Sequence, residues 1–492
     1  MAAEIETSYE LFIGGKSVPG AEGGRATLLN PATNRPLATT ALATASDARN
    51  AMEVADRAFR ESGWAGDDGA RRARTLVKLA QLLDSRLEAF TALESLNQGK
   101  PLREAKGDIA FVVRTLEYAS GLADKIQGET IPVPGARFDY TVREPLGVTV
   151  HIAPWNFPLV LAIRSVAPAL AAGNAVVLKP ASLTPLTAIK FAQLATEAGV
   201  PAGILNVVVG SGREVGEALL QDPRGRAISF TGSVEVGHRI AELAAQRMVP
   251  ATLELGGKSP VVVFADADLD RAAKAVGFGI FGNAGQMCWA GSRLIVHASV
   301  HAAFLDKVRS IAAALRLGAG TDPGVEMGPL VSAEHATRVL GYVEIARSDG
   351  GKILTGGGRP AAPELSNGNF VQPTVIDGVP GTSRSVREEI FGPVLTVSSF
   401  ETTEEAIAQA NATEFGLFAA LWTRDVAVAH SVAQRLEAGM VTVNDPPMTF
   451  PQSPFTGFKE SGLGFEQGID AVRAYTRRKN VLVNLGGARP KK

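Results

Sequence analysis

The residue best suited to chemistry in this sequence is its single cysteine. Cys288 lies in FGNAGQMCWAGSR (281–293), where glycines and small residues after a predicted helix would leave a thiol accessible. An accessible thiolate is a strong nucleophile, whereas a lone cysteine is often only a small apolar core residue. None of the six histidines lies in a motif that pairs with it. A carboxylate is therefore the base to consider.

Two further segments place polar residues where predicted strands end. TLELGGKSP (252–260) puts Glu254 before a Gly-Gly turn that would open the backbone to a ligand. IAPWNFP (152–158) puts Asn156 in a proline-flanked turn at the carboxyl edge of a sheet, where ligands bind in doubly wound folds. The Asn156 amide can donate to a developing oxyanion. The alternatives are a Glu254 satisfied by turn amides and an Asn156 that caps a helix.

One glycine-containing turn is typical of phosphate binding. FTGSVEVG (230–237) combines a strand, a Gly-Ser turn and a helix N-terminus, although this spacing alone is a weak signal. GSGREVG (210–216) has one residue too many for the dinucleotide fingerprint.

Composition excludes several classes of protein. The 492 residues suffice for two large domains or three ordinary ones, and 46% hydrophobic with 20% charged residues indicates a folded chain. With 49 Lys+Arg against 50 Asp+Glu, no nucleic-acid partner is expected. One cysteine excludes an intramolecular disulfide framework and a CxxC metal site, which favours the reducing cytoplasm, and no metal is expected. The N-terminus lacks a signal-peptide pattern and the apolar stretches are interrupted, so neither export nor membrane association is expected.

From about residue 147 the pattern alternates short β-branched runs with helix-length segments, which predicts parallel sheets covered by helices. The first, Rossmann-like series has strands at 148–152, 175–179, 205–209 and 227–230, with helices near 159–172, 184–198, 213–222 and 234–246. The second has strands at 260–264, 293–298, 394–400 and 440–444, with helices near 267–280, 300–315, 333–348, 402–411 and 426–437. The sequence thus predicts an α/β fold with two domains.

The remaining segments flank these series. Helices near 46–62, 68–96 and 101–125 would cover the first domain, and 356–370 is a surface loop. The strand-like segments 125–146 and 474–487 have no local partners, and we interpret them as a small discontinuous β appendage.

Together the motifs resemble those of the aldehyde dehydrogenase superfamily, along nearly the whole chain. PWNFP (154–158), KPAS (179–182), FTGS (230–233), LELGGKSP (253–260), GQMC (285–288), EEIFGPV (388–394) and PFTGFKESGLG (454–464) occur in the family's order, with 34 residues between Glu254 and Cys288. The resemblance implies a Rossmann-like cofactor domain (1–125 and 147–255), an α/β catalytic domain (256–445), and a β oligomerisation arm (126–146 and 470–492). A homodimer or homotetramer is then expected.

The resemblance also implies an activity, the irreversible NAD(P)-dependent oxidation of an aldehyde to its acid. Cys288 would attack the aldehyde, Asn156 and the Cys288 N–H would hold the oxyanion, and Glu254 would activate water to hydrolyse the thioester. Lys179 would bind the adenosine ribose, Glu389 and Phe391 the nicotinamide riboside, and the turn at Gly232 and Ser233 the pyrophosphate. The full expected cofactor set is Ile152, Ala153, Pro154, Trp155, Lys179, Ser182, Gly212, Gly216, Phe230, Thr231, Gly232, Ser233, Val236, Leu255, Gly256, Glu389 and Phe391.

Departures from the family pattern bear on cofactor and substrate. Many NAD-preferring members have Glu after KPA, whereas this chain has Ser182, so NADP is expected to be accepted, possibly beside NAD. Arg164 stands where enzymes for neutral aldehydes are often apolar, so a semialdehyde acid or a hydroxylated aromatic aldehyde is expected; the alternative is an Arg164 that pairs structurally with an acidic residue. PFTGF and FEQG (465–468) depart without a physical explanation. The expected tunnel consists of Phe111, Phe157, Arg164, Met287, Trp289, Met448, Thr449 and Phe455.

Two other functions are compatible with this scaffold. A CoA-acylating dehydrogenase would pass the thioester to CoA, which the presence of Glu254 disfavours, because that base serves water. A non-catalytic structural protein would be expected to have lost the catalytic set.

Overall fold

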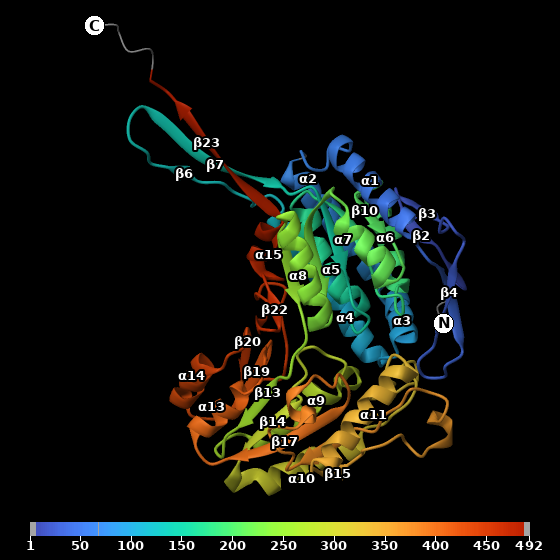
Figure 1. Cartoon of the computed structure of the whole chain (residues 1–492), viewed down its shortest axis with the longest axis vertical. Coiled ribbons are helices and arrows are strands. Elements are labelled where there is room, and N and C mark those ends of the chain that lie inside the picture. Colours follow the sequence, from blue (N-terminus) through green and yellow to red (C-terminus); the bar gives the residue numbers. More distant parts are fainter. Residues whose placement is uncertain (1–5, 67, 487–492) are drawn as a thin grey trace.

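The computed structural model describes residues 6–66 and 68–486, which form two α/β bodies and a projecting β arm (Figure 1). The first body is built on an eight-stranded sheet of order β22-β12-β11-β8-β9-β10-β2-β3. Its five central strands are parallel: β8 (Val148–Ile152), β9 (Ala175–Lys179), β10 (Leu205–Val207), β11 (Gly225–Thr231) and β12 (Ala251–Glu254). The four strands predicted for the first series are therefore present, although β10 ends at Val207.

The order of these strands determines where a ligand can bind. From β8 the chain proceeds outward through β9 and β10, and then returns to the other side of β8 to form β11 and β12. The succession therefore reverses between β8 and β11, and crevices in doubly wound sheets open at such switch points. The turn containing Asn156 follows β8, and the turn containing Gly232 follows β11.

Helices cover both faces of the first sheet, as Figure 1 shows. They are α1 (Ala45–Glu61), α2 (Gly69–Ser85), α3 (Leu87–Gln98), α4 (Leu102–Leu122), α5 (Pro158–Ala171), α6 (Leu186–Ala198), α7 (Glu217–Gln221) and α8 (Val234–Arg247). The helix predicted over 68–96 is two helices, because Arg86 leaves the helical conformation at φ −112° and ψ 18°. The helix predicted over 213–222 begins with a π-helical turn, Gly212–Gly216.

The second body holds a seven-stranded sheet of order β15-β16-β17-β14-β13-β19-β20. Its strands are β13 (Pro260–Val263), β14 (Arg293–His297), β15 (Lys352–Thr355), β16 (Thr374–Asp377), β17 (Val394–Phe400), β19 (Phe418–Trp422) and β20 (Met440–Val443). The main helices are α9 (Leu269–Phe281), α10 (His301–Ala314), α11 (Ala333–Ser348), α13 (Thr403–Asn411) and α14 (Val426–Arg435). The four predicted strands and five predicted helices are present; β15, β16 and β19 were not predicted.

The predicted β appendage is a three-stranded arm that projects from the first body (Figure 1). It consists of β6 (Thr130–Ile131), β7 (Arg137–Pro145) and β23 (Thr476–Asn484), with β23 antiparallel to β7 along its whole length. Residues 487–492 of the expected arm, and residues 1–5 of the expected cofactor domain, lie outside the described part of the chain.

Several short strands were not predicted from the sequence. β1 (Ser8–Tyr9), β4 (Arg25–Leu29) and β5 (Pro36–Ala41) form a separate sheet, while β2 (Leu11–Ile13) and β3 (Lys16–Val18) extend the first sheet. β18 (Phe415–Gly416) pairs with β21 (Phe458–Lys459), and β22 (Gly462–Leu463) joins the first sheet beside β12, ahead of α15 (Gly468–Ala474). Among the described residues, no helix is both long and apolar enough to cross a membrane.

Candidate active site

Cys288 lies where two cavities meet. It follows α9 through a short 3-10 turn in which Asn283 and Ala284 have positive φ angles of 47° and 53°. Gly285 must be glycine in this turn, because a Cβ there would lie 2.1 Å from Gly392 O. A Cβ at Gly257 would likewise lie 2.2 Å from Cys288 O. The turn before Cys288 is thus packed against Gly392, and the segment that contains Gly257 is packed against Cys288 itself. These two contacts fix the backbone of the cysteine.

The first cavity, of about 150 Å³, opens at the predicted switch point of the first sheet. Trp155 and Phe391 meet edge to face there, with ring centroids 5.2 Å apart, and Phe391 holds an unfavourable positive φ of 62°. The cavity is lined by Pro154, Trp155, Asn156, Leu161, Thr231, Gly232, Ser233, Leu255, Gly256, Cys288, His335, Arg338, Glu389 and Phe391.

The second cavity, of about 190 Å³, also reaches Cys288 and has an aromatic wall. It is lined by Gly107, Asp108, Phe111, Arg114, Phe157, Val160, Leu161, Arg164, Cys288, Trp289, Pro447, Met448, Thr449, Phe455 and Gln467. A thiol between two such cavities can face a different molecule in each.

The surroundings of Cys288 disfavour its thiolate. Desolvation raises the pKa of the thiol to about 12, and the charges of Glu389 and Glu254 add to this, while Arg164 opposes it. The resting group is therefore a neutral thiol at neutral pH, and attack on a substrate requires a proton acceptor.

Glu254 is the carboxylate placed for that role. It ends β12, is 2% exposed, and neither of its carboxylate oxygens has a hydrogen-bond partner among the described residues. Burial raises its pKa well above the usual range; the charge of Glu466 raises it further and that of Arg164 lowers it. An unpartnered buried carboxyl is costly, which makes Glu254 a candidate functional residue.

Arg164 and Glu466 form a buried ion pair beside Glu254. Arg164 Nε donates to Glu466 Oε2, with both side chains at most 4% exposed. The guanidinium also lies 4.3 Å from the ring centroid of Phe455, and its Nη2 has no partner among the described residues. Arg164 therefore lines the second cavity and is also paired with an acid, as the alternative reading of the sequence expected; its effect on substrate choice stays a prediction.

Asn156 is oriented by the loop that carries the cysteine. Its Nδ2 donates to Gln286 O at 2.9 Å, and its side chain is buried. Since an amide nitrogen carries two N–H groups, one remains for a ligand at Cys288.

The first cavity and its surroundings fit a dinucleotide. α8 begins after Ser233, whose side chain caps no N–H, so the helix N-terminus has free donors for a pyrophosphate. Burial lowers the pKa of Lys179 to about 8, and this ammonium forms no ion pair in the described residues. Glu389 Oε1 accepts from Gly257 N at 2.8 Å, and burial raises the pKa of the carboxyl to about 7.

The structure brings most of the predicted site residues together. Predicted cofactor residues that do not line the first cavity are Ile152, Ala153, Lys179, Ser182, Gly212, Gly216, Phe230 and Val236. Of these, Phe230 packs against Gly232, because a Cβ on Gly232 would lie only 2.4 Å from the Phe230 ring. Of the predicted tunnel, only Met287 does not line the second cavity. Its side chain is 7% exposed and packs in the core of the second body, so its expected place in the wall is corrected.

Several residues of the site were not predicted from the sequence. His335 and Arg338 project from α11 into the first cavity, and His335 Nε2 donates to Phe391 O at 2.7 Å. Asp108, Arg114 and Gln467 line the second cavity. The i, i+3 spacing of His335 and Arg338 on one helix face was the available signal.

Comparison with known proteins decides the family. A model of the aldehyde dehydrogenase family matches residues 18–481. The chain belongs to the aldehyde dehydrogenase family. It is 43% identical over 482 residues to an aldehyde dehydrogenase named DhaS of Bacillus subtilis, a match that covers 98% of this chain and 97% of the relative. It is also 43% identical to the hydroxyisobutyraldehyde dehydrogenase of Mycolicibacterium austroafricanum, over 96% of this chain and 94% of that relative. The crystal structure of betaine aldehyde dehydrogenase from Staphylococcus aureus in complex with NAD+ superposes with a TM-score of 0.96 at 37% identity, covering 98% and 96%.

We predict that the thiol of this aldehyde dehydrogenase is slow to alkylate. With cofactor absent, iodoacetamide should label Cys288 slowly at pH 7, and the rate should rise roughly tenfold per pH unit up to pH 9, because the pKa of about 12 keeps the thiolate scarce. Mass spectrometry of the intact chain measures this without ambiguity, since there is one cysteine. Cys288→Ala is the unlabelled control, and a rate that is already constant from pH 6 upward would contradict the buried-thiol description.

Proposed function

We propose that this aldehyde dehydrogenase oxidises its aldehyde to a free carboxylic acid with NAD or NADP. The observation that carries the proposal is the thiol of Cys288 between two cavities, one suited to a dinucleotide and one with an apolar wall. A nicotinamide dinucleotide in the first cavity supplies the hydride acceptor. An aldehyde in the second reaches the same sulfur.

The residues of the site divide the reaction between them. Glu254 accepts the thiol proton, and the Cys288 sulfur bonds to the aldehyde carbon. The free N–H of Asn156 Nδ2 and the Cys288 N–H hold the oxyanion. Loss of hydride from the carbon leaves a thioester on Cys288. Once Glu254 has released the thiol proton to solvent, its carboxylate accepts a proton from water; the water oxygen bonds to the thioester carbon, the carbon–sulfur bond breaks, and the acid is released.

Hydrolysis and CoA transfer make different products, and Glu254 decides between them. Cys288→Ala should abolish activity, because no other thiol exists. Glu254→Gln should give one equivalent of NAD(P)H, formed more slowly than in wild type because the thiol has lost its proton acceptor, followed by turnover slowed about 100-fold or more, since the thioester waits for unassisted water. Stopped-flow absorbance with product analysis measures both. Acyl-CoA as the only product, or wild-type turnover in Glu254→Gln, would contradict the proposal.

Acceptance of NADP is the finer proposal for the cofactor. The hydroxyl of Ser182 donates to Gly210 O at 2.9 Å, so in this structure it is not free to donate to a 2′-phosphate. Support comes instead from the absence of a carboxylate at position 182 and from the unpaired ammonium of Lys179.

Ser182→Glu should therefore lower kcat/KM for NADP at least tenfold while changing that for NAD by less than threefold, because the added carboxylate repels a 2′-phosphate. Ser182→Gln is the matched neutral control. A wild-type preference for NAD above about a hundredfold, roughly 2.7 kcal/mol, would defeat the proposal.

For the substrate we favour an aromatic aldehyde that carries a hydrogen-bond-accepting group. The second cavity presents Phe111, Phe157, Trp289 and Phe455. Two buried donors on its lining residues, Arg164 Nη2 and Gln467 Nε2, have no partner among the described residues. Glu466 already neutralises Arg164, which favours a hydroxyl acceptor over a full carboxylate. The unpaired Nη2 still supports a semialdehyde acid as the second candidate.

A test of Arg164 must remove Glu466 as well, since an unpaired Glu466 would itself repel anions. In Arg164→Met/Glu466→Gln, kcat/KM on 4-hydroxybenzaldehyde should fall at least tenfold more than on benzaldehyde. Succinic semialdehyde with butanal forms the second matched pair, and the larger loss in that pair would favour the acid substrate. Equal losses within both pairs would show that Arg164 does not recognise the substrate.

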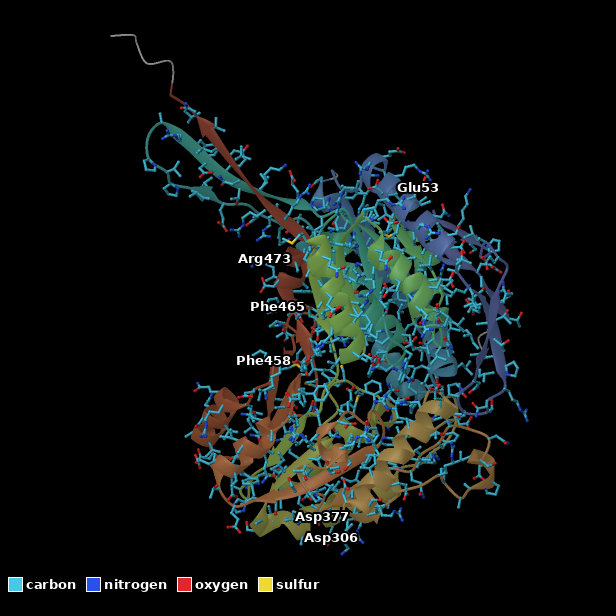
Figure 2. The ribbon with its side chains drawn as sticks, viewed as in Figure 1. Glu53, Asp306, Asp377, Phe458, Phe465 and Arg473 are labelled. Carbon is cyan, nitrogen blue, oxygen red and sulfur yellow. The ribbon has the colours of Figure 1, made fainter. Side chains whose placement is uncertain are left out.

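A homodimer or homotetramer assembled through the arm is the proposal for quaternary structure. The arm exposes Phe138 at 46%, Leu482 at 55% and Leu485 at 65%, more apolar surface than a free arm would favour. Figure 2 labels Phe458, Phe465 and Arg473 along the C-terminal segment that leads from the second body up to the arm, and both phenylalanines are also about half exposed.

Phe138→Asp/Leu482→Asp should therefore convert the assembly to smaller species, because two buried carboxylates would be unpaired at the interface. Light scattering coupled to size exclusion measures the mass. Met248→Asp, at the most exposed of the large apolar residues, is the control. An unchanged mass in the arm variant would exclude the arm as the interface.

A further inference from the structure

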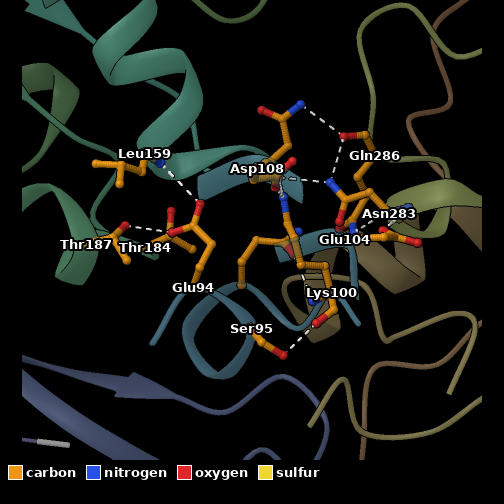
Figure 3. Close-up of polar contacts among 12 residues, drawn as sticks. Glu94, Ser95, Lys100, Glu104, Asp108, Leu159, Thr184, Thr187, Asn283 and Gln286 are labelled. Atoms are coloured by element: carbon orange, nitrogen blue, oxygen red, sulfur yellow. Dashed lines mark hydrogen bonds and ion pairs between the residues drawn. The ribbon is translucent and has the colours of Figure 1, made fainter. Parts of the chain in front are cut away.

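A buried cluster of charged residues lies behind the turn that carries Asn156, outside the set of reacting groups. It is centred on Lys100, which precedes α4 and whose side chain is completely buried. Figure 3 shows the lysine extending toward Asp108, with Asn283 and Gln286 on one side and Glu94 on the other. A fully buried ammonium is expensive, so its contacts should explain why it is there.

The Lys100 ammonium makes three contacts at once. It pairs with Asp108 Oδ2 at 2.6 Å, donates to Asn156 O at 3.0 Å, and lies 3.9 Å from the ring centroid of Phe157. Two of these contacts are with consecutive residues of the turn that links β8 to α5. One cation therefore binds the main chain of Asn156 and the ring of Phe157, which lines the second cavity.

The same carbonyl is held from a second direction. Asn283 Nδ2 donates to Asn156 O at 2.8 Å, and Glu104 Oε2 accepts from Asn283 N at 2.8 Å. The Asn156 side chain donates to Gln286 O, and Gln286 is itself fixed by Asn283 O and Val331 N. Asn156 is thus clamped at its carbonyl by Lys100 and Asn283, and at its amide by the cysteine loop.

The neighbouring acids do not offer Lys100 an equivalent partner. Glu94 Oε2 accepts from Thr187 Oγ1 at 2.6 Å, and Glu94 Oε1 accepts from Leu159 N at 3.2 Å. Burial raises the pKa of Glu94, and raises that of Glu104 to about 7. Asp108 alone forms a direct ion pair with the ammonium.

We propose that Lys100 is a positioning residue of the reaction: anchored by Asp108, its ammonium sets the position of the oxyanion donor Asn156 and of the Phe157 ring that borders the aldehyde. The inference rests on the proposed function, because it assigns Lys100 an effect transmitted through Asn156. A lysine that only stabilised the fold would act independently of that amide.

The test is a double-mutant cycle on initial-rate kcat/KM for benzaldehyde. Lys100→Met should lower kcat/KM at least tenfold in the wild-type background, mainly through kcat, because a displaced amide weakens the transition state more than ground-state binding. In the Asn156→Ala background, the same substitution should cost less than threefold, because the group it positions is already gone. Equal losses in both backgrounds would overturn the inference.

Two further variants keep the result interpretable. Asp108→Asn leaves the lysine in place but removes its anchor, so if Lys100→Met does not fold, this milder change should show the same dependence on Asn156. Arg293→Met removes another buried cation that binds only backbone carbonyls, those of Lys258, Gln409 and Ala410, and its loss should be equal with and without Asn156.

The cycle also separates the inference from the proposed function. If wild type fails to reduce NAD(P) with any aldehyde, the proposed function fails. If wild type is active, Asn156→Ala is impaired, and the losses from Lys100→Met and Asp108→Asn are additive to it, the positioning role alone fails.

Discussion

Desolvation of the ionisable groups around Cys288 is the constraint on which this active site depends. Water would hold a thiol and two carboxyls near their ordinary pKa values, whereas burial moves the pKa values of Cys288, Glu254 and Glu389 upward together. Arg164 opposes the shift at both Cys288 and Glu254, and Glu466 limits its effect by pairing with it. The protonation state of each of these groups therefore depends on the charges of the others.

The scaffold maintains this constraint through close backbone packing. The glycines at 257 and 285 allow two loops from different parts of the second body to approach the cysteine, and side chains at either position would collide with main-chain oxygens. α5, which carries Arg164, is buried along nearly its entire length. The charged groups thus cannot escape to solvent by small rearrangements. Arg164 and Glu466 offset the cost by pairing with each other, whereas the oxygens of Glu254 have no partner among the described residues.

The sequence was informative wherever chemistry is local. The β-branched runs that became β8, β9, β13 and β14 were recognisable by composition. Cys288 stood out as the one cysteine, in a glycine-containing segment after a predicted helix, and Glu254 and Asn156 by their place at strand ends. The sequence did not indicate which residues that are far apart along the chain pair with each other in the fold. Glu466 lies 302 residues after Arg164, and no local pattern marks the two as partners. The N-terminal strands are at most six residues long, and the break at Arg86 depends on a single residue's dihedral angles, so periodicity could detect neither.

The route of the C-terminal segment has a consequence for how the chain folds. After β20 closes the second sheet, the segment returns to the first body, contributes β22 beside β12 and Glu466 beneath α5, and ends in the arm. During synthesis, a first body made only of the preceding residues has an edge strand without its partner and a buried arginine without its counter-charge. Its native arrangement therefore has to wait until β22 and Glu466 have been synthesised. A chain truncated before β22 would retain the nucleophile but lack Glu466, the counter-charge of Arg164.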